Sequence, residues 1–144
     1  MDIREKLIRE WFQRLGSHDF QRLGELLTED AVMELVHFDS EKVNAHTTVE
    51  YKNPLVGRDA IIRLYTKSAE IFDDLTFDIT AVHLVEGGTI AVVEYRCDGI
   101  ALPTGRPYRN IYAAIFEFGN GRISLWREYH DPSVYDRAFA PAGA

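Results

Sequence analysis

The residues best suited to acid/base chemistry lie in the last third of the chain. Glu128 stands two positions from Trp126 and two from His130 in the run Trp-Arg-Glu-Tyr-His. Residues two apart in a strand project from the same face, so this carboxyl would lie against an aromatic side chain. Desolvation would then raise its pKa toward the range useful for a general acid/base. The alternative is an exposed glutamate paired with an arginine, because acidic side chains are seldom buried.

A second strand-like run offers a phenol and an amide. Tyr112 and Asn110 alternate with Ala114 and Phe116, so all four could face one cavity. A phenol and an amide could both polarise a substrate carbonyl. A tyrosine packed in the core, with its hydroxyl bonded to the backbone, is the alternative. Glu128, Tyr112 and Asn110 are therefore the candidate catalytic residues.

Candidates for substrate binding come from other strand-like runs. A histidine can carry protons near neutral pH, although a lone histidine on an apolar face more often packs in the core. Cys97 is the only cysteine, and as a nucleophile it would need a base beside it, so we expect it to line a wall. The candidate substrate-binding residues are Tyr51, Asn53, Tyr95, Cys97, Trp126, His37 and His130.

Composition narrows the possible partners. The net charge of -7 argues against a surface that follows nucleic-acid phosphates. The sequence shows no metal-ligand spacing, phosphate-binding glycine loop or dinucleotide fingerprint, so it predicts chemistry without a metal or other cofactor. The sequence has no apolar run of the length of a signal peptide or membrane span, and a single cysteine suits a reducing compartment. We expect a cytoplasmic protein that binds a small apolar or aromatic molecule, with no nucleic-acid or membrane partner.

Helices are predicted in the first half of the chain. Apolar residues recur every three or four positions from Ile3 to Leu15, which is typical of an amphipathic helix that Gly16 can end. Asp19 can cap a shorter helix that pairs with the first as a hairpin and stops at residues 28–30. Asp59 is the expected cap of a third helix lying across a sheet.

Strands are predicted to dominate the second half. The chain of 144 residues is 46% apolar, which suits one domain over residues 1–144. Helices followed by a meander predict an α+β fold, with a curved antiparallel sheet packed on three N-terminal helices and a ligand site in the concavity. The loop 39–48 and the tail after Pro132 would shape that site. The predicted strands are residues 31–38, a short one around 49–51, 75–85, 89–98, 108–118 and 122–130.

This order of elements resembles the cone-shaped nuclear transport factor 2-like superfamily, a cystatin-like α+β roll. The superfamily includes SnoaL-type polyketide cyclases, ketosteroid isomerases and limonene epoxide hydrolases. The motifs are most similar to the phenazine biosynthesis A/B family, in Leu27-Thr28-Glu29-Asp30, Cys97-Asp98-Gly99, Asn110-x-Tyr112 and Arg127-Glu128-Tyr129-x-Asp131-Pro132.

That resemblance implies a homodimer whose pockets carry an acidic residue on the final strand, here Glu128. The active members also use a histidine on the third helix. The stretch around Leu64 and Tyr65 has none. Phenazine-precursor condensation is therefore not expected.

The run 101–105 also resembles limonene epoxide hydrolase, which carries Arg-x-Asp on a neighbouring strand. Arg96 and Asp98 could supply this pair, but an ungapped alignment places Tyr95 and Cys97 there instead. A shift of one residue moves every side chain to the other face of a sheet. Because Tyr95 and Cys97 belong to an apolar row, Arg96 and Asp98 are most simply assigned to a solvated or dimer-facing surface.

The sequence leads to three functional hypotheses. The first is a cofactor-independent enzyme that isomerises, cyclises, dehydrates or condenses an apolar or aromatic carbonyl compound by acid/base proton transfer. The second is a non-catalytic small-molecule-binding module, which the missing third-helix histidine favours. The third is an epoxide hydrolase of the limonene type, which requires Arg96 and Asp98 to point inward. In each case the convex face of the sheet, rich in aromatics, predicts a homodimer.

Overall fold

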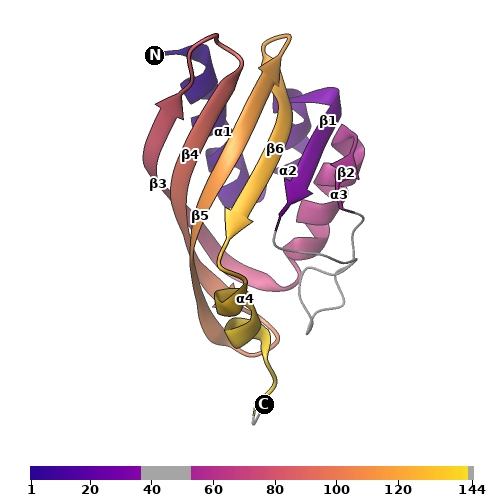
Figure 1. Cartoon of the computed structure of the whole chain (residues 1–144). Helices are drawn as coiled ribbons and strands as arrows, with labels where there is room; N and C mark the ends of the chain where they lie inside the picture. Colours follow the sequence, from indigo (N-terminus) through magenta and orange to yellow (C-terminus); the bar gives the residue numbers. More distant parts are fainter. Residues whose placement is uncertain (37–52, 143–144) are drawn as a thin grey trace.

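A curved six-stranded sheet forms the centre of the computed structural model, which describes residues 1–36 and 53–142 (Figure 1). The strands lie in the order β2-β1-β6-β5-β4-β3. The predicted α+β fold with a curved sheet is confirmed. The strands are β1 (Leu27–Leu35), β2 (Leu55–Val56), β3 (Phe72–Leu84), β4 (Ile90–Ala101), β5 (Arg106–Gly119) and β6 (Arg122–His130).

The last four strands form the predicted antiparallel meander. The sheet departs from the prediction at one pair, because β1 runs parallel to β6, with Met33 opposite Trp126. Antiparallel pairing is imposed by short hairpin connections. Strands β1 and β6 are separated by most of the chain, so no hairpin dictates their relative direction.

Three helices cover one face of the sheet and lie behind it in Figure 1: α1 (Ile3–Gly16), α2 (Phe20–Leu23) and α3 (Arg58–Ser68). Helix α1 follows the predicted bounds, and its apolar stripe is buried from Leu7 to Leu15. The rings of Trp11 and Trp126 meet edge to face with centroids 4.8 Å apart. This contact joins α1 to the strand that carries Glu128.

The prediction for the second helix was wrong in length. Helix α2 is one turn, followed by a 3-10 turn over Gly24–Leu26, and residues 28–30 belong to β1. Pairing with β6 begins at Leu27, which lies opposite Ile123, and this pairing overrides the helical pattern. The cap of α3 also differs, because the N-cap is Gly57 and Asp59 lies in the first turn.

A fourth helix, α4 (Pro132–Phe139), follows β6 at the lower end of the sheet in Figure 1 and packs against β5. From the sequence, this segment is expected only to be a tail that follows Pro132 and shapes the site. The Asp131 carboxylate accepts hydrogen bonds from the Ser133 backbone N–H at 2.9 Å and from the Ser133 hydroxyl at 2.7 Å. Together with proline in the first turn, this cap is a recognisable helix start.

The predicted short strand around 49–51, the loop 39–48, Tyr51 and His37 lie outside the described residues. The described helices include none that combines the length and the apolar character needed to cross a membrane.

Candidate active site

An apolar cavity lies between the concave face of the sheet and the helices, with a volume of about 90 Å³. The wall of the cavity is built from all four helices, or from segments next to them, and from every strand except β2. Aromatic and aliphatic side chains dominate, with one carboxyl, that of Glu128, among the described lining residues. The cavity is therefore an environment that disfavours charge.

Glu128 projects from β6 into this cavity. The alternation of β6 buries Trp126 and His130 on the same face, as the spacing predicts. The Glu128 side chain keeps 12% of its surface exposed. Desolvation raises the pKa of this carboxyl from 4.5 to about 7, and a hydrogen bond from Tyr95 opposes the rise. The group can thus hold or release a proton near neutral pH.

Tyr95, a predicted substrate-binding residue, is buried on β4 and bonds Glu128 across the sheet. Its hydroxyl donates to Glu128 Oε2 at 2.8 Å. Burial and the nearby Glu128 charge raise the pKa of Tyr95 well above its ordinary value, so the phenol keeps its proton. Its ring stacks on Tyr112 at 4.9 Å and 6°.

Tyr112 lines the cavity as part of a hydrogen-bonded chain on β5. Its hydroxyl bonds the hydroxyl of Tyr108, and Asn110 Nδ2 donates to Tyr108 Oη at 3.0 Å. Tyr108 also lines the cavity. Tyr108 is not among the candidates predicted from the sequence, although the pattern Tyr108-x-Asn110-x-Tyr112 places all three residues on one strand face.

Asn110 is a buried anchor for the segment that leads into α4. Its Nδ2 also donates to the Asp131 carbonyl at 3.0 Å, and its Oδ1 accepts the N–H groups of Ile111 and Asp131. Asn110 lies outside the set of side chains that line the cavity. The Asn110 amide therefore lies behind Tyr108, and its role in catalysis stays a prediction.

The next three candidates, Trp126, His130 and Asn53, differ in their positions and contacts. Trp126 lines the cavity and stacks on Tyr65 at 5.6 Å. The His130 imidazole is fully buried, and its Nδ1 lies 3.9 Å from Glu128 Oε1. Asn53 binds the backbone of Leu35, donating to its carbonyl and accepting from its N–H.

Cys97 lines the cavity from β4. Burial, with the charges of Glu128 and Asp98, raises the pKa of this thiol far above its ordinary value. A protonated thiol is a poor nucleophile. Cys97 thus forms part of the wall, as expected from its place in the apolar row.

Arg96 and Asp98 lie on the opposite face of β4 and are exposed, as the face pattern predicts. Asp98 forms an ion pair with Arg109, with Nε and Oδ1 3.2 Å apart. The Arg-x-Asp arrangement needed for epoxide hydrolysis does not enter the cavity. On α3, Leu64 and Tyr65 line the wall, and this is the stretch in which the sequence already lacks the histidine that the resemblance associates with active members.

Within residues 1–36 and 53–142, no three histidine, cysteine, aspartate or glutamate side chains are grouped so that they could hold a metal ion.

The chain is similar in sequence to a known domain family and to a bacterial relative. A family profile for the SnoaL-like domain matches residues 8–126. The uncharacterised Bacillus subtilis (strain 168) protein YesE is 27% identical over 132 residues, which cover 92% of this chain and 84% of YesE.

Solved structures of other proteins share this fold. A B. subtilis protein with a provisional description as an isomerase matches with a TM-score of 0.82 and 25% identity, covering 96% of each chain. An M. tuberculosis LEH-like epoxide hydrolase matches with a TM-score of 0.70 and 19% identity, covering 93% of this chain and 86% of the hydrolase. The second likeness concerns the fold alone.

Proposed function

The chain belongs to the SnoaL-like domain family, and we propose that it is an acid/base enzyme that moves a proton on a small apolar or aromatic carbonyl compound. The observation that carries this proposal is the Glu128 carboxyl. It lies in an apolar cavity, is bonded by a tyrosine and has a pKa of about 7. A base is most effective when its pKa lies near the working pH.

Glu128 would act first as the base. Its carboxylate takes a proton from the carbon next to the substrate carbonyl, and the electron pair of that C–H bond forms the C=C bond of an enolate. The carbonyl π pair moves onto oxygen. For a substrate whose C=C bond joins the second and third carbons from the carbonyl carbon, the enolate is conjugated with that bond. The oxygen pair then re-forms C=O, the double bond moves next to the carbonyl, and the electron pair of the original C=C bond takes the proton from Glu128 at the third carbon. This completes an isomerisation and regenerates the Glu128 carboxylate.

The tyrosine pair would stabilise the enolate oxygen. Asn110 Nδ2 can only donate, so Tyr108 Oη accepts from it, and the Tyr108 hydroxyl can donate its own hydrogen bond to Tyr112 Oη. The Tyr112 hydroxyl is then available to donate into the cavity. Each donor in such a chain polarises the next, which strengthens the last hydrogen bond.

The relationship with the isomerase-like B. subtilis structure supports this reaction class. The rival is a binding module, and the apolar wall at Leu64 and Tyr65 favours it. Epoxide hydrolysis is not proposed, because Arg96 and Asp98 are exposed on the other face.

Deuterium exchange tests the proposal without the natural substrate. Acetophenone incubated in D2O with the protein should gain deuterium at its methyl carbon, as followed by NMR. Glu128→Gln should slow the protein-dependent exchange by about 10²- to 10⁴-fold. Glu94→Gln is the matched control, because Glu94 is exposed and bonded to His83.

Equal exchange by wild type and Glu128→Gln would contradict a catalytic role for Glu128. Acetophenone that binds to the wild type without any acceleration of exchange would favour the binding module instead.

A further inference from the structure

Four aromatic rings that line the cavity form a stacked series. His18 stacks on Phe20 at 5.3 Å, and Phe20 stacks on Tyr65 at 6.4 Å. Tyr65 stacks in turn on Trp126 at 5.6 Å. His18 is exposed and Trp126 is buried, so the series leads from solvent to the strand that carries Glu128.

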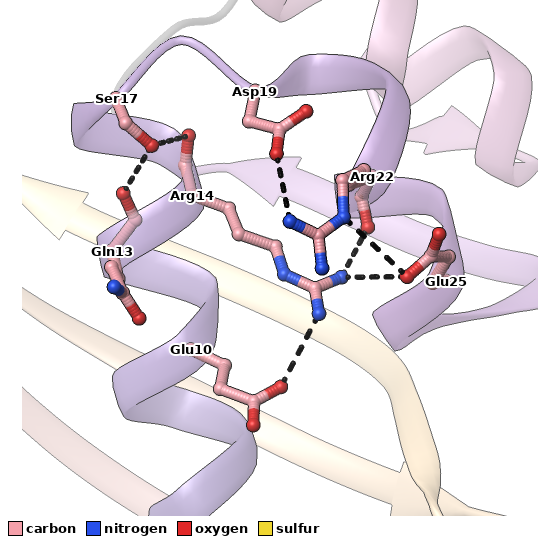
Figure 2. Close-up of polar contacts among 7 residues, drawn as sticks. All are labelled: Glu10, Gln13, Arg14, Ser17, Asp19, Arg22 and Glu25. Atoms are coloured by element: carbon pink, nitrogen blue, oxygen red, sulfur yellow. Dashed lines mark hydrogen bonds and ion pairs between the residues drawn. The ribbon is translucent and has the colours of Figure 1, made fainter.

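A network around Arg14 holds the turn that carries His18 (Figure 2). The Arg14 guanidinium donates to the Arg22 carbonyl at 2.6 Å and pairs with Glu25 at 3.2 Å and Glu10 at 3.5 Å. The Arg14 carbonyl accepts the Asp19 N–H at 2.9 Å. Contacts on both sides of His18 therefore fix the turn before any ligand arrives.

The backbone of His18 is itself unusual, with a φ of 58°. Few residues other than glycine adopt this left-handed conformation, although histidine, asparagine and aspartate do so more often than most. In this conformation the ring lies against Phe20 and lines the cavity.

The size of the cavity limits what can enter it. Its volume of about 90 Å³ is smaller than the roughly 150 Å³ engineered cavity that binds benzene. The interior can therefore hold about one small ring or less, and any further part of a ligand must extend through the opening. Among the described lining residues, His18 is exposed, and its ring nitrogens could form hydrogen bonds with the part of a ligand that lies outside the cavity.

We propose that His18 binds the substrate at the mouth, by donating a hydrogen bond to an oxygen substituent remote from the reacting carbonyl. This inference rests on the proposed function, because it assumes that the carbonyl lies near Glu128 and Tyr112. The substrate class becomes a compact, one-ring carbonyl compound with an oxygen-bearing group at its far end.

Two phenols provide the test, because a phenol oxygen can take the place of the enolate oxygen. The probes are 4-nitrophenol, whose nitro oxygens accept hydrogen bonds, and 4-isopropylphenol, which has a similar shape and no acceptor there. Their dissociation constants are measured by calorimetry for wild type, His18→Gly and His18→Gln. Glycine tolerates the left-handed backbone, so His18→Gly removes the ring without adding strain.

Loss of one hydrogen bond predicts that His18→Gly weakens 4-nitrophenol binding about 5-fold, while 4-isopropylphenol changes less than about 2-fold. The amide of His18→Gln should restore part of the difference. An equal loss for both phenols would show that the ring only supports the turn, and would overturn the inference.

The proposed function is tested separately with the same probes. If Tyr112→Phe and Glu128→Gln leave the affinity for both phenols unchanged, the acid/base site is wrong while the His18 comparison still stands. If neither phenol binds the wild type, both proposals fail.

Discussion

At the scale of single residues, two opposing effects of its surroundings set the pKa of Glu128. The carboxyl is surrounded by apolar and aromatic side chains, and its polar partner, Tyr95, keeps its own proton. Desolvation favours the neutral acid, and the Tyr95 hydrogen bond favours the carboxylate. The balance between these two effects places the pKa of Glu128 near neutrality.

Removing the Tyr95 hydroxyl should shift that balance. In Tyr95→Phe the carboxylate loses a hydrogen bond, so the pKa of Glu128 should rise above its wild-type value of about 7. The measurement is a pH titration of the 13C-labelled side-chain carboxyl by NMR, with Glu128→Gln to assign the signal.

Tyr112→Phe is the matched control, because the Tyr112 hydroxyl bonds Tyr108 rather than Glu128. The pKa of Glu128 should rise less in Tyr112→Phe than in Tyr95→Phe. A wild-type Glu128 that titrates near 4.5 would contradict the burial argument itself.

The raised pKa also predicts how stability depends on pH. The folded state holds the Glu128 proton up to about pH 7, whereas the unfolded chain releases it near 4.5. Between these values the folded state binds more protons, so the free energy of unfolding falls as pH rises. The contribution present at low pH, up to about 3 kcal/mol, is lost by pH 8.

Glu128→Gln cannot ionise and should lack this decline. Its free energy of unfolding relative to wild type should therefore increase between pH 4.5 and pH 8, as measured by urea denaturation at each pH. Glu94→Gln, at an exposed position, should follow the wild-type curve. Parallel curves for Glu128→Gln and wild type would mean that Glu128 titrates normally when folded.

At the scale of elements, strands β3 and β4 approach each other closely beside an irregularity in their pairing. The pairing register shifts between Asp73 and Thr76, and Gly99 lies opposite this irregularity. A Cβ atom at Gly99 would lie 2.7 Å from Leu75 Cδ2 and 3.0 Å from the Asp73 carbonyl oxygen. The missing side chain permits the close approach of the two strands.

Gly99→Ala should therefore lower the free energy of unfolding by about 1 to 3 kcal/mol, because the backbone of β3 must move. Gly119→Ala is the matched control in the same sheet, since its nearest neighbour would be 3.9 Å away. Thermal and urea unfolding of both variants measure the difference. Equal stability of the two variants would show that the strands adjust without cost.

At the scale of the whole molecule, the face of the sheet opposite the helices offers a surface for a second copy. Ile111 on β5 is 66% exposed, and Ile100 and Tyr129 are also exposed. Apolar side chains mixed with charged ones such as Arg96 suit an interface between two copies. We propose a homodimer through this face, as the resemblance implies.

Light scattering should give the mass of a dimer for the wild type, and Ile111→Arg should shift it toward the monomer. Ile3→Arg provides the control, because Ile3 is 59% exposed but lies on α1. A monomeric wild type would contradict the proposal, as would a dimer that Ile111→Arg leaves intact.

The sequence by itself determined helix α1, the four strands of the meander and the faces of those strands. Apolar spacing of three and four in α1, and of two in β4, β5 and β6, follows from the local geometry of helices and strands. Burial in the structure matches those faces, including the exposed Arg96 and Asp98. Glu128 could be singled out because its neighbours along the strand already surrounded it with aromatic side chains.

Only the tertiary structure decided which side chains meet. Three contacts depend on register, curvature and rotamers. They are the hydrogen bond from Tyr95 to Glu128, the bond between Tyr108 and Tyr112, and the bond by which Asn110 holds the segment before α4. The parallel pairing of β1 with β6 was likewise decided only by the tertiary structure. These features arise between segments distant in the chain, and periodicity along one segment contains no information about its partner across the sheet.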